Sequence, residues 1–256
     1  MATDKNERIA IDRLHLGTMG WSYSFWTGTL YPPELKPGEY LQEYSKHFNS
    51  VEIDSTFYRT PSPQTVQTWE KQVPTGFKFA AKFPRLITHE RMLRDCRQQA
   101  DRFIATMSQL NDKLGPLLIQ LPPTFTIKHF AQLQDFLEDL PTGCRYAVEI
   151  RNAQLRNENL WHLLRKTETA MVLINQSASG GVDPATSGFV YMRWEGDRRK
   201  IKGTLGKVEV DRTEELRAST QAVRTFLDRQ LDVFGYFSKY FSGFPPGDVK
   251  ALQAFF

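Results

Sequence analysis

Eight short apolar stretches alternate with amphipathic stretches along this chain, and this alternation restricts the fold more than any other feature. The apolar stretches have the length and composition of strands, and they cover residues 14–17, 50–54, 77–82, 117–121, 146–151, 170–175, 189–194 and 233–237. Strands that alternate with helices pair in parallel through right-handed crossovers, and eight of them close a barrel. The sequence therefore predicts a TIM-type (β/α) barrel of eight parallel strands.

Most of these strands are followed by apolar residues at the three- to four-residue spacing of a helix face. The predicted helices cover 39–48, 62–73, 91–110, 130–140, 160–164 and 216–226. Ser62 and Pro63 are a typical N-cap and first-turn pair, so we expect a helix to begin there. Between the sixth and seventh strands, Gln176 to Gly188 is rich in Ser, Gly, Asp and Pro, which favours a loop. At least one outer helix is therefore expected to be missing or reduced.

The length of 256 residues fits one such barrel. We expect a loose polar tail over residues 1–12 and a single barrel domain over 13–256. The first residues lack the apolar core of a signal peptide, and no apolar run reaches the length of about 18 residues that a membrane span needs. Cys96 and Cys144 form no Cys-x-x-Cys pair, which suits a reducing compartment. The sequence thus predicts a cytoplasmic protein without a membrane partner.

Charged or amide side chains close most of the predicted strands. They are Glu52, Asp54, Lys82, Gln120, Glu149, Arg151, Asn175, Arg193 and Glu195. In barrels of this kind the carboxyl ends of the strands form the working face. Where one strand contributes two of these residues, they lie two positions apart and point to the same side. We therefore expect a polar site at the C-terminal mouth of the barrel.

Three of these residues carry a permanent positive charge, and this favours an anionic ligand. Guanidinium groups match the geometry of phosphates and carboxylates, and Lys supplies a point charge. The expected substrate-binding set is Lys82, Arg151 and Arg193, together with Asp54, Gln120 and Asn175.

Glu52, Glu149 and the nearby His89 are the candidates for proton transfer. Acid-base chemistry on an anion leads us to predict an enzyme, a hydrolase or a lyase. Its substrate is expected to be a small phosphate-bearing or otherwise anionic molecule.

Three alternatives use the same side chains. Glu52, Asp54 and Glu149 would suit a magnesium or manganese ion, because these metals prefer oxygen ligands. The charged residues at the strand ends would also suit a purely structural network of ion pairs, without a ligand. Glu52 and Glu149 would suit the carboxylate pair of a glycoside hydrolase, whose mechanism depends on their separation.

Aromatic residues follow the first two strands, and Trp21 and Tyr58 are the candidates for ligand contact among them. Such rings stack on a base or a sugar face, or they cover a core. Together with the basic run at 198–202 and a formal net charge of +4, these rings favour an alternative to the enzyme. In this alternative the protein is a non-catalytic module that binds nucleic acid or another protein. No Gly-x-Gly-x-x-Gly follows the first strand and no phosphate loop is present, so a dinucleotide cofactor is not expected.

Several motifs together resemble the YecE-like family, which is catalogued as domain of unknown function seventy-two. They are Gly17 to Tyr23, Val51 to Pro63, Lys82, Thr88-His89, Leu118 to Pro123, and Ala147 to Arg151. The resemblance covers nearly the whole chain. It implies a barrel related in shape to xylose isomerase and to endonuclease-type barrels, and by that analogy of fold a role with nucleic acid.

Two positions depart from the pattern of this family. Glu195 stands where many members carry His, so no strand-seven imidazole is expected to act here. Ser238-Lys239 stands where relatives often show paired asparagines, although Gly243 to Pro246 again resembles the family. The resemblance therefore implies that an amide contact at strand eight is lost or replaced.

Overall fold

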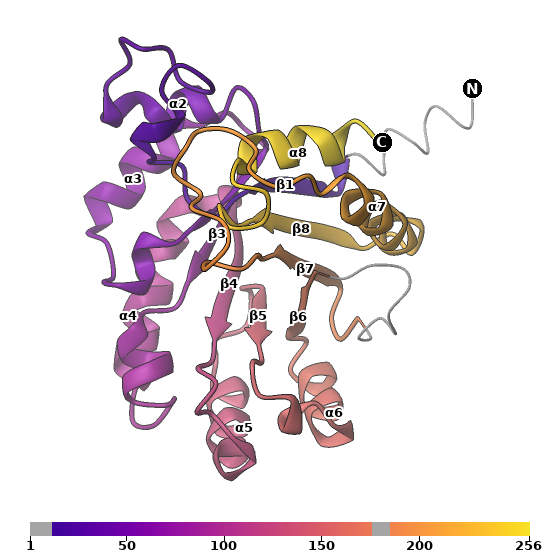
Figure 1. The fold of residues 1–256 in the computed structure, drawn as a ribbon. Coiled ribbons are helices and arrows are strands. Elements are labelled where there is room, and N and C mark those ends of the chain that lie inside the picture. Colours follow the sequence, from indigo (N-terminus) through magenta and orange to yellow (C-terminus); the bar gives the residue numbers. More distant parts are fainter. Residues whose placement is uncertain (1–11, 176–184) are drawn as a thin grey trace, which may run out of the picture. The chain divides into compact units, whose positions relative to one another are not determined.

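The computed structural model describes residues 12–175 and 185–256, and in these ranges eight strands alternate with helices (Figure 1). The strands are β1 (Leu14–Thr18), β2 (Ser50–Ile53), β3 (Lys78–Lys82), β4 (Leu114–Gln120), β5 (Tyr146–Glu149), β6 (Ala170–Ile174), β7 (Phe189–Trp194) and β8 (Asp232–Phe237). Their order in the sheet is β1-β8-β7-β6-β5-β4-β3-β2. This is the strand order of a TIM-type (β/α) barrel, and the predicted fold class is confirmed.

The α-helices lie between the strands in the chain, apart from one after β8. They are α2 (Tyr40–Tyr44), α3 (Pro63–Gln72), α4 (Arg97–Met107), α5 (Phe130–Glu138), α6 (Glu158–Lys166), α7 (Thr213–Asp228) and α8 (Pro245–Gln253). The predicted start of α3 is confirmed, because the Ser62 hydroxyl accepts a hydrogen bond from the Thr65 amide at 3.2 Å. The sequence reasoning missed α8, although Pro245 at its first position is a typical start signal.

The helix predicted over 91–110 begins later than expected, at Arg97. Met92, Leu93 and Asp95 have φ angles of 52°, 66° and 48°. This left-handed region is incompatible with a right-handed helix, so the apolar spacing there is misleading. Just before this segment, Leu86–Glu90 forms a single π-helical turn that carries His89. Such turns occur frequently at functional sites.

The contacts of the described residues gather in two compact units. The first unit contains residues 12–52, 173–175 and 189–256, and the second contains 53–172 and 185–188. The single domain over 13–256 stays a prediction. Of the predicted tail over 1–12, only residue 12 belongs to the described residues. Of the predicted loop over 176–188, only residues 185–188 are described, and they form no helix.

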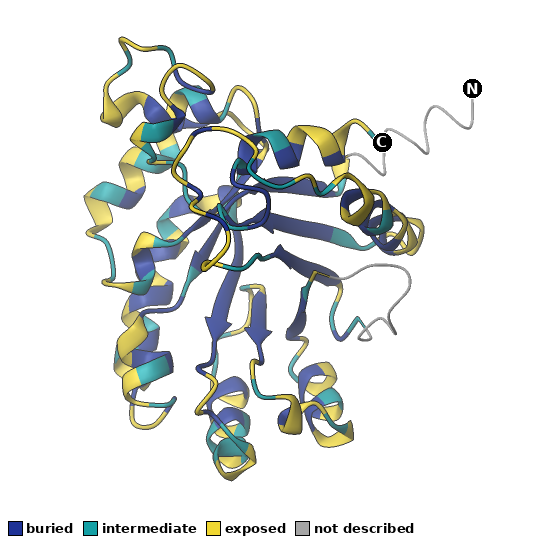
Figure 2. Ribbon diagram, in the orientation of Figure 1, coloured by how far each residue is buried: buried dark blue, intermediate teal, exposed yellow. Residues whose placement is uncertain are grey.

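In the first unit, β8 lies between β1 and β7. The parallel ladders run from the pair Leu14 and Val233 to the end of β1, and from the pair Phe189 and Asp232 to the end of β7. Helix α8 packs on β1 and β8, and α7 packs on β8. Figure 2 shows these strands in the colour of buried residues, whereas the helices carry exposed residues on one side. The core of this unit therefore lies along the strands.

The junction of β1 with β2, here called the β1–β2 seam, depends on side chains. Among the described residues, its backbone contact is one parallel bridge, between Met19 and Glu52. The buried Tyr44 hydroxyl accepts a hydrogen bond from the Thr18 amide at 2.8 Å and donates one to the Ser50 carbonyl at 3.0 Å. A side chain of α2 thus connects the two strands where a continuous ladder is missing.

Two further residues shape the β1–β2 seam. The Asn49 side chain accepts a hydrogen bond from the Leu16 amide at 3.0 Å and donates one to the Leu14 carbonyl at 2.8 Å. Gly17 lies so close to β2 that a Cβ atom there would stand 1.9 Å from the Ser50 carbonyl oxygen. Only glycine permits this approach of the two backbones.

In the second unit, β4 pairs with β3 and β5, and β5 pairs with β6, all in parallel. Lys82 at the end of β3 is level with Leu118 of β4, and Gln120 at the end of β4 is level with Glu149 of β5. The register therefore places the carboxyl ends of β3, β4 and β5 at one edge. This edge carries most of the predicted site residues of the unit.

Candidate functional site

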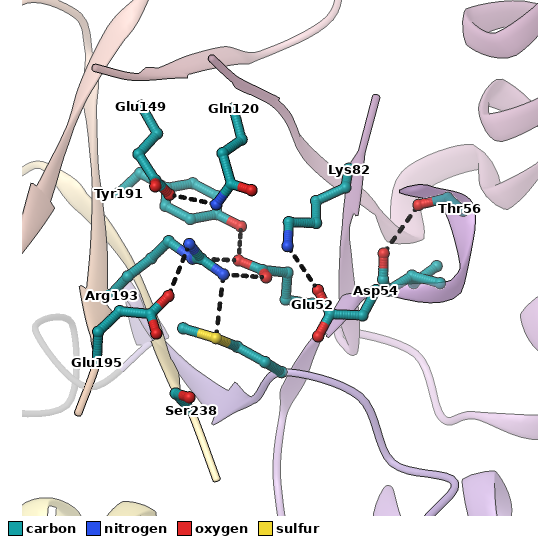
Figure 3. Close-up of polar contacts among 12 residues, drawn as sticks. Glu52, Asp54, Thr56, Lys82, Gln120, Glu149, Tyr191, Arg193, Glu195 and Ser238 are labelled. Carbon is teal, nitrogen blue, oxygen red and sulfur yellow. Dashed lines mark hydrogen bonds and ion pairs between the residues drawn. The ribbon is translucent and has the colours of Figure 1, made fainter. Parts of the chain in front are cut away.

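The predicted site residues of the first unit centre on a buried ion pair, here called the Glu52–Arg193 cluster. Glu52 is 0% exposed and Arg193 is 2% exposed. The guanidinium donates from Nε to Oε2 and from Nη2 to Oε1 of Glu52, both at 3.0 Å (Figure 3). The Tyr191 hydroxyl donates to the same Oε2 at 2.7 Å. Both oxygens of the Glu52 carboxylate are therefore bound by protein donors.

Arg193 has further partners in this unit. Its Nη1 lies 2.9 Å from Oε1 of Glu195, and its Nη2 donates to the Met19 sulfur at 3.1 Å. Burial, and next the negative charge of Glu52, raise the pKa of Tyr191 well above its usual value, so Tyr191 remains a donor. This dense pairing favours the structural ion-pair alternative for these residues. Proton transfer by Glu52 and anion binding by Arg193 stay predictions.

Asn175 and Trp21 are the other predicted site residues of this unit. The Asn175 amide donates to the Glu195 carbonyl at 2.9 Å and accepts from the Glu195 amide at 2.7 Å, so it aligns the chain after β7. Trp21 is half-buried, in a loop in which Trp26 is fully buried. Substrate contact by Asn175 and Trp21 stays a prediction.

In the second unit, Glu149 holds Arg151. Glu149 is 1% exposed, and its Oε2 accepts from Nε2 of Gln120 at 2.9 Å (Figure 3). Its Oε1 accepts from Nε of Arg151, also at 2.9 Å. The Arg151 side chain is 36% exposed, and among the described residues its two terminal nitrogens have no hydrogen-bond partner. The fork of the guanidinium is thus oriented by the protein and available to a ligand.

Lys82 and His89 share an aromatic neighbour. The Lys82 ammonium donates to Oδ1 of Asp54 at 2.9 Å and lies 5.5 Å from the centre of the Phe57 ring. The same ring packs nearly perpendicular to the His89 ring, with the ring centres 5.0 Å apart. Tyr58, the next residue, is 80% exposed. We call Lys82, His89 and Arg151 the cationic cluster, because the positive charges of Lys82 and Arg151 both act on His89.

The electrostatic surroundings of His89 favour its neutral form. Its Nδ1 lies 2.9 Å from the Thr88 hydroxyl. Burial lowers the pKa of His89 below 6.5, and the positive charges of Arg151, Arg85 and Lys82 lower it further. A neutral imidazole among cations is able to accept a proton at neutral pH.

Protonation of His89 should reduce the stability of the folded chain in acid. Because its folded-state pKa is depressed, the unfolded chain takes up this proton first as the pH falls below 6.5. The contribution of His89 to the free energy of unfolding is therefore present above pH 6.5 and is lost as the pH falls towards the lower folded-state pKa. In His89→Gln, we expect a smaller drop in urea-unfolding free energy between about pH 7.5 and about pH 5.5.

The control for this measurement is His162→Gln, since His162 is exposed on α6. It should keep the parental pH dependence. A His89→Gln curve parallel to that of the parent would contradict the depressed pKa.

The predicted magnesium or manganese alternative finds no support in the side-chain contacts. Within residues 12–175 and 185–256, no group of three or more His, Cys, Asp or Glu side chains is arranged to hold a metal ion. Protein donors bind both oxygens of Glu52 and of Glu149, and Lys82 binds one oxygen of Asp54.

Sequence reasoning missed two contacts that organise these clusters. Tyr191 has the same parity as Arg193 on β7, and this signal was present in the strand pattern. Phe57 gave no such signal, because its position between Lys82 and His89 depends on the loop after β2.

Comparison with known proteins identifies the family. The model of the family described as "Protein of unknown function DUF72" matches residues 15–256. The chain belongs to the DUF72 family. The resemblance inferred from the motifs is therefore confirmed.

The curated relatives of this DUF72 chain include proteins of Escherichia coli and Bacillus subtilis. The UPF0759 protein YecE of Escherichia coli strain K12 is 35% identical over 142 residues, which cover 55% of this chain and 49% of that protein. The UPF0759 protein YunF of Bacillus subtilis strain 168 is 30% identical over 121 residues, which cover 45% of this chain and 42% of that protein. The matched region thus spans about half the length of these curated relatives or less.

Solved structures of DUF72 family proteins share the fold. The protein from Thermotoga maritima MSB8 has a TM-score of 0.70 at 23% identity, over 94% of this chain and 96% of that one. A protein from Enterococcus faecalis V583 has a TM-score of 0.72 at 21% identity, over 94% of each chain. These similarities establish the architecture of the DUF72 chain.

The described part of the DUF72 chain contains no helix that is both long and apolar enough to cross a bilayer. The cytoplasmic location and the partners, a small anionic substrate or nucleic acid, stay predictions.

Proposed function

We propose that this DUF72 chain is an enzyme that acts on a phosphate-bearing or otherwise anionic small molecule at the carboxyl ends of β3, β4 and β5. The observation that carries the proposal is the state of Arg151. Glu149 holds its Nε, while both terminal nitrogens lack a partner among the described residues. Such a fork is suited to bind two oxygens of a phosphate or carboxylate.

Lys82 supplies the second positive charge for the anion. An ammonium has three donors, and the contact with Asp54 uses one of them. The Lys82 side chain is 12% exposed, so an anion bound there is partly shielded from water. The positive charges of Lys82 and Arg151 both lower the pKa of His89, and this supports the proposal that one anion interacts with all three side chains.

His89 is the proton-transfer group in this proposal. It is neutral when the site is empty, and an anion that offsets the nearby cations would raise its pKa toward neutrality. It would then accept a proton from water or from a substrate carbon, as hydrolysis or elimination requires. Glu149 is also a proton-transfer candidate from the sequence, but both its oxygens are bound, so we assign it the positioning of Arg151.

The contacts support a glycoside hydrolase less well. That chemistry needs one carboxylic acid and one free carboxylate at the scissile bond. Glu52 and Glu149 each have both oxygens bound by protein donors.

Thermal shift tests the proposal. The purified chain would be heated with inorganic phosphate, ribose 5-phosphate and a short oligonucleotide, and the affinity of any active compound measured by calorimetry. A ligand at about 100 times its Kd adds about 2.7 kcal/mol of stability, which gives a visible rise in Tm. Arg151→Ala should weaken the binding of a phosphate-bearing compound about tenfold or more, because a charge-assisted contact is lost.

The control is Arg102→Ala, since Arg102 is an exposed arginine of α4 in the same unit. It should bind like the parent. Equal binding by Arg151→Ala would refute the role of Arg151. A response to the oligonucleotide alone, with a steep dependence on salt, would instead indicate the non-catalytic nucleic-acid module, in which the exposed Tyr58 offers a stacking surface.

A further inference from the structure

A separate cavity lies in the first unit at the carboxyl end of β7. Its volume is about 480 Å³, and sites for small molecules measure about 300–1,000 Å³. It lies between the ends of β6 and β7, the first turns of α7 and the loop after β8, and its lining includes Asn175, Trp194, Glu195, Arg212, Glu215 and Phe241. None of these residues belongs to the cationic cluster, so the cavity is independent of the proposed function.

Hydrogen bonds between these elements hold the walls of the cavity in place. The Trp194 indole donates to the Ser219 hydroxyl at 2.9 Å, which links β7 to α7. Arg212 donates from Nε to the Phe241 carbonyl at 3.0 Å and from Nη1 to Oε1 of Glu215 at 2.7 Å. The cavity is therefore bounded by fixed side chains, as expected of a preformed binding site.

The charges of the lining do not balance. Arg212 pairs with Glu215 one to one. The guanidinium of Arg193 pairs with two carboxylates. It makes a bidentate contact with Glu52, and it also forms an ion pair with Glu195. The lining itself contains three carboxylates, of Glu195, Asp197 and Glu215, and one guanidinium, that of Arg212. The Glu195 side chain is 23% exposed and lines the cavity, and among the described residues its Oε2 has no hydrogen-bond partner.

We propose that this cavity binds a small organic cation, an ammonium or guanidinium group on a short carbon chain. Glu195 is the charge partner of the cation, and Glu215 has its second oxygen available to assist. Trp194 and Phe241 also line the cavity, but they are only 1% and 3% exposed, so the contact between the cation and the carboxylates carries the binding. The excess carboxylate selects against anions, so this cavity and the cationic cluster take ligands of opposite charge.

Calorimetry with a matched pair of probes tests this inference. The full chain would be titrated with the diamine putrescine and with the uncharged butanediol of the same chain length. We expect binding of the diamine and none of the diol. Glu195→Gln keeps an oxygen for Arg193 but removes the excess charge, and it should weaken diamine binding about tenfold or more.

The control is Glu214→Gln, since Glu214 lies on the same first turn of α7 but is exposed and does not line the cavity. It should bind the diamine like the parent. If Glu195→Gln does not fold, Glu215→Gln replaces it, with a smaller expected loss. Equal binding of diol and diamine, an unchanged affinity in the folded variant, or an equal loss in Glu214→Gln would each overturn the proposal.

Discussion

Replacement of Arg193 by methionine should lower the free energy of unfolding by about 3–5 kcal/mol. Methionine is of similar length, so the main change is the loss of the guanidinium. Glu52 is 0% exposed, and without Arg193 it keeps the hydrogen bond from the Tyr191 hydroxyl but loses its bidentate contact with the guanidinium. Removing one partner of a buried ion pair is far more costly than the net value of the pair. Urea unfolding at equilibrium measures the loss.

Two further variants separate this effect from a general loss of charge. Arg217→Met removes an exposed pair with Glu214 on α7, and it should cost less than about 1 kcal/mol. The double variant Glu52→Gln with Arg193→Met removes both charges, so it should be more stable than Arg193→Met alone. If Arg193→Met costs no more than Arg217→Met, the Glu52–Arg193 cluster does not stabilise the fold.

Removal of the Tyr44 hydroxyl should have the next largest effect, because this one oxygen is hydrogen-bonded to both β1 and β2. Tyr44→Phe keeps the ring but takes the acceptor from the Thr18 amide and the donor from the Ser50 carbonyl. Tyr44, Thr18 and Ser50 are each 0% exposed, so water does not readily replace the hydroxyl. We expect a loss of about 2 to 3 kcal/mol in urea unfolding, and faster hydrogen exchange at the Thr18 amide.

Tyr40→Phe is a matched control on the same helix, α2. The Tyr40 hydroxyl has a long contact of 3.3 Å with the Thr27 hydroxyl, and the loss should stay below about 1 kcal/mol. Equal losses in both variants would show that the Tyr44 hydroxyl stabilises the fold no more than the Tyr40 hydroxyl does, and would contradict the importance of the link across the β1–β2 seam.

The strands were predictable because each has a local signal that burial enforces. Phe189–Trp194, for example, lies where expected, because its side chains are buried throughout. The start of α4 was not predictable, since Met92 and Leu93 continue a helical apolar spacing although their backbone is left-handed. Local strain of this kind is set by tertiary contacts and leaves no trace in periodicity.

The sequence predicted which residues belong to the candidate site, but not which carboxylate pairs with which guanidinium. Parity placed Glu149 and Arg151 on one side of the strand predicted over 146–151, and the two do form an ion pair. Parity did not predict that Arg193 would be fully engaged while Arg151 keeps two nitrogens available, because that depends on which carboxylates reach each guanidinium.

The pairing of β1 with β8 also affects the order in which parts of the chain are able to fold during synthesis. The stretch 53–172, which makes up nearly all of the second unit, is continuous, so it is complete before β7 and β8 have been made. β1 leaves the ribosome well before β8, because its ladder partner lies 219 residues later, as the contact between Arg13 and Asp232 illustrates. Until β8 follows, β1 presents an apolar open edge, and such edges are sites of aggregation and of chaperone capture. The nascent chain is therefore exposed to aggregation at β1 until β8 has been made.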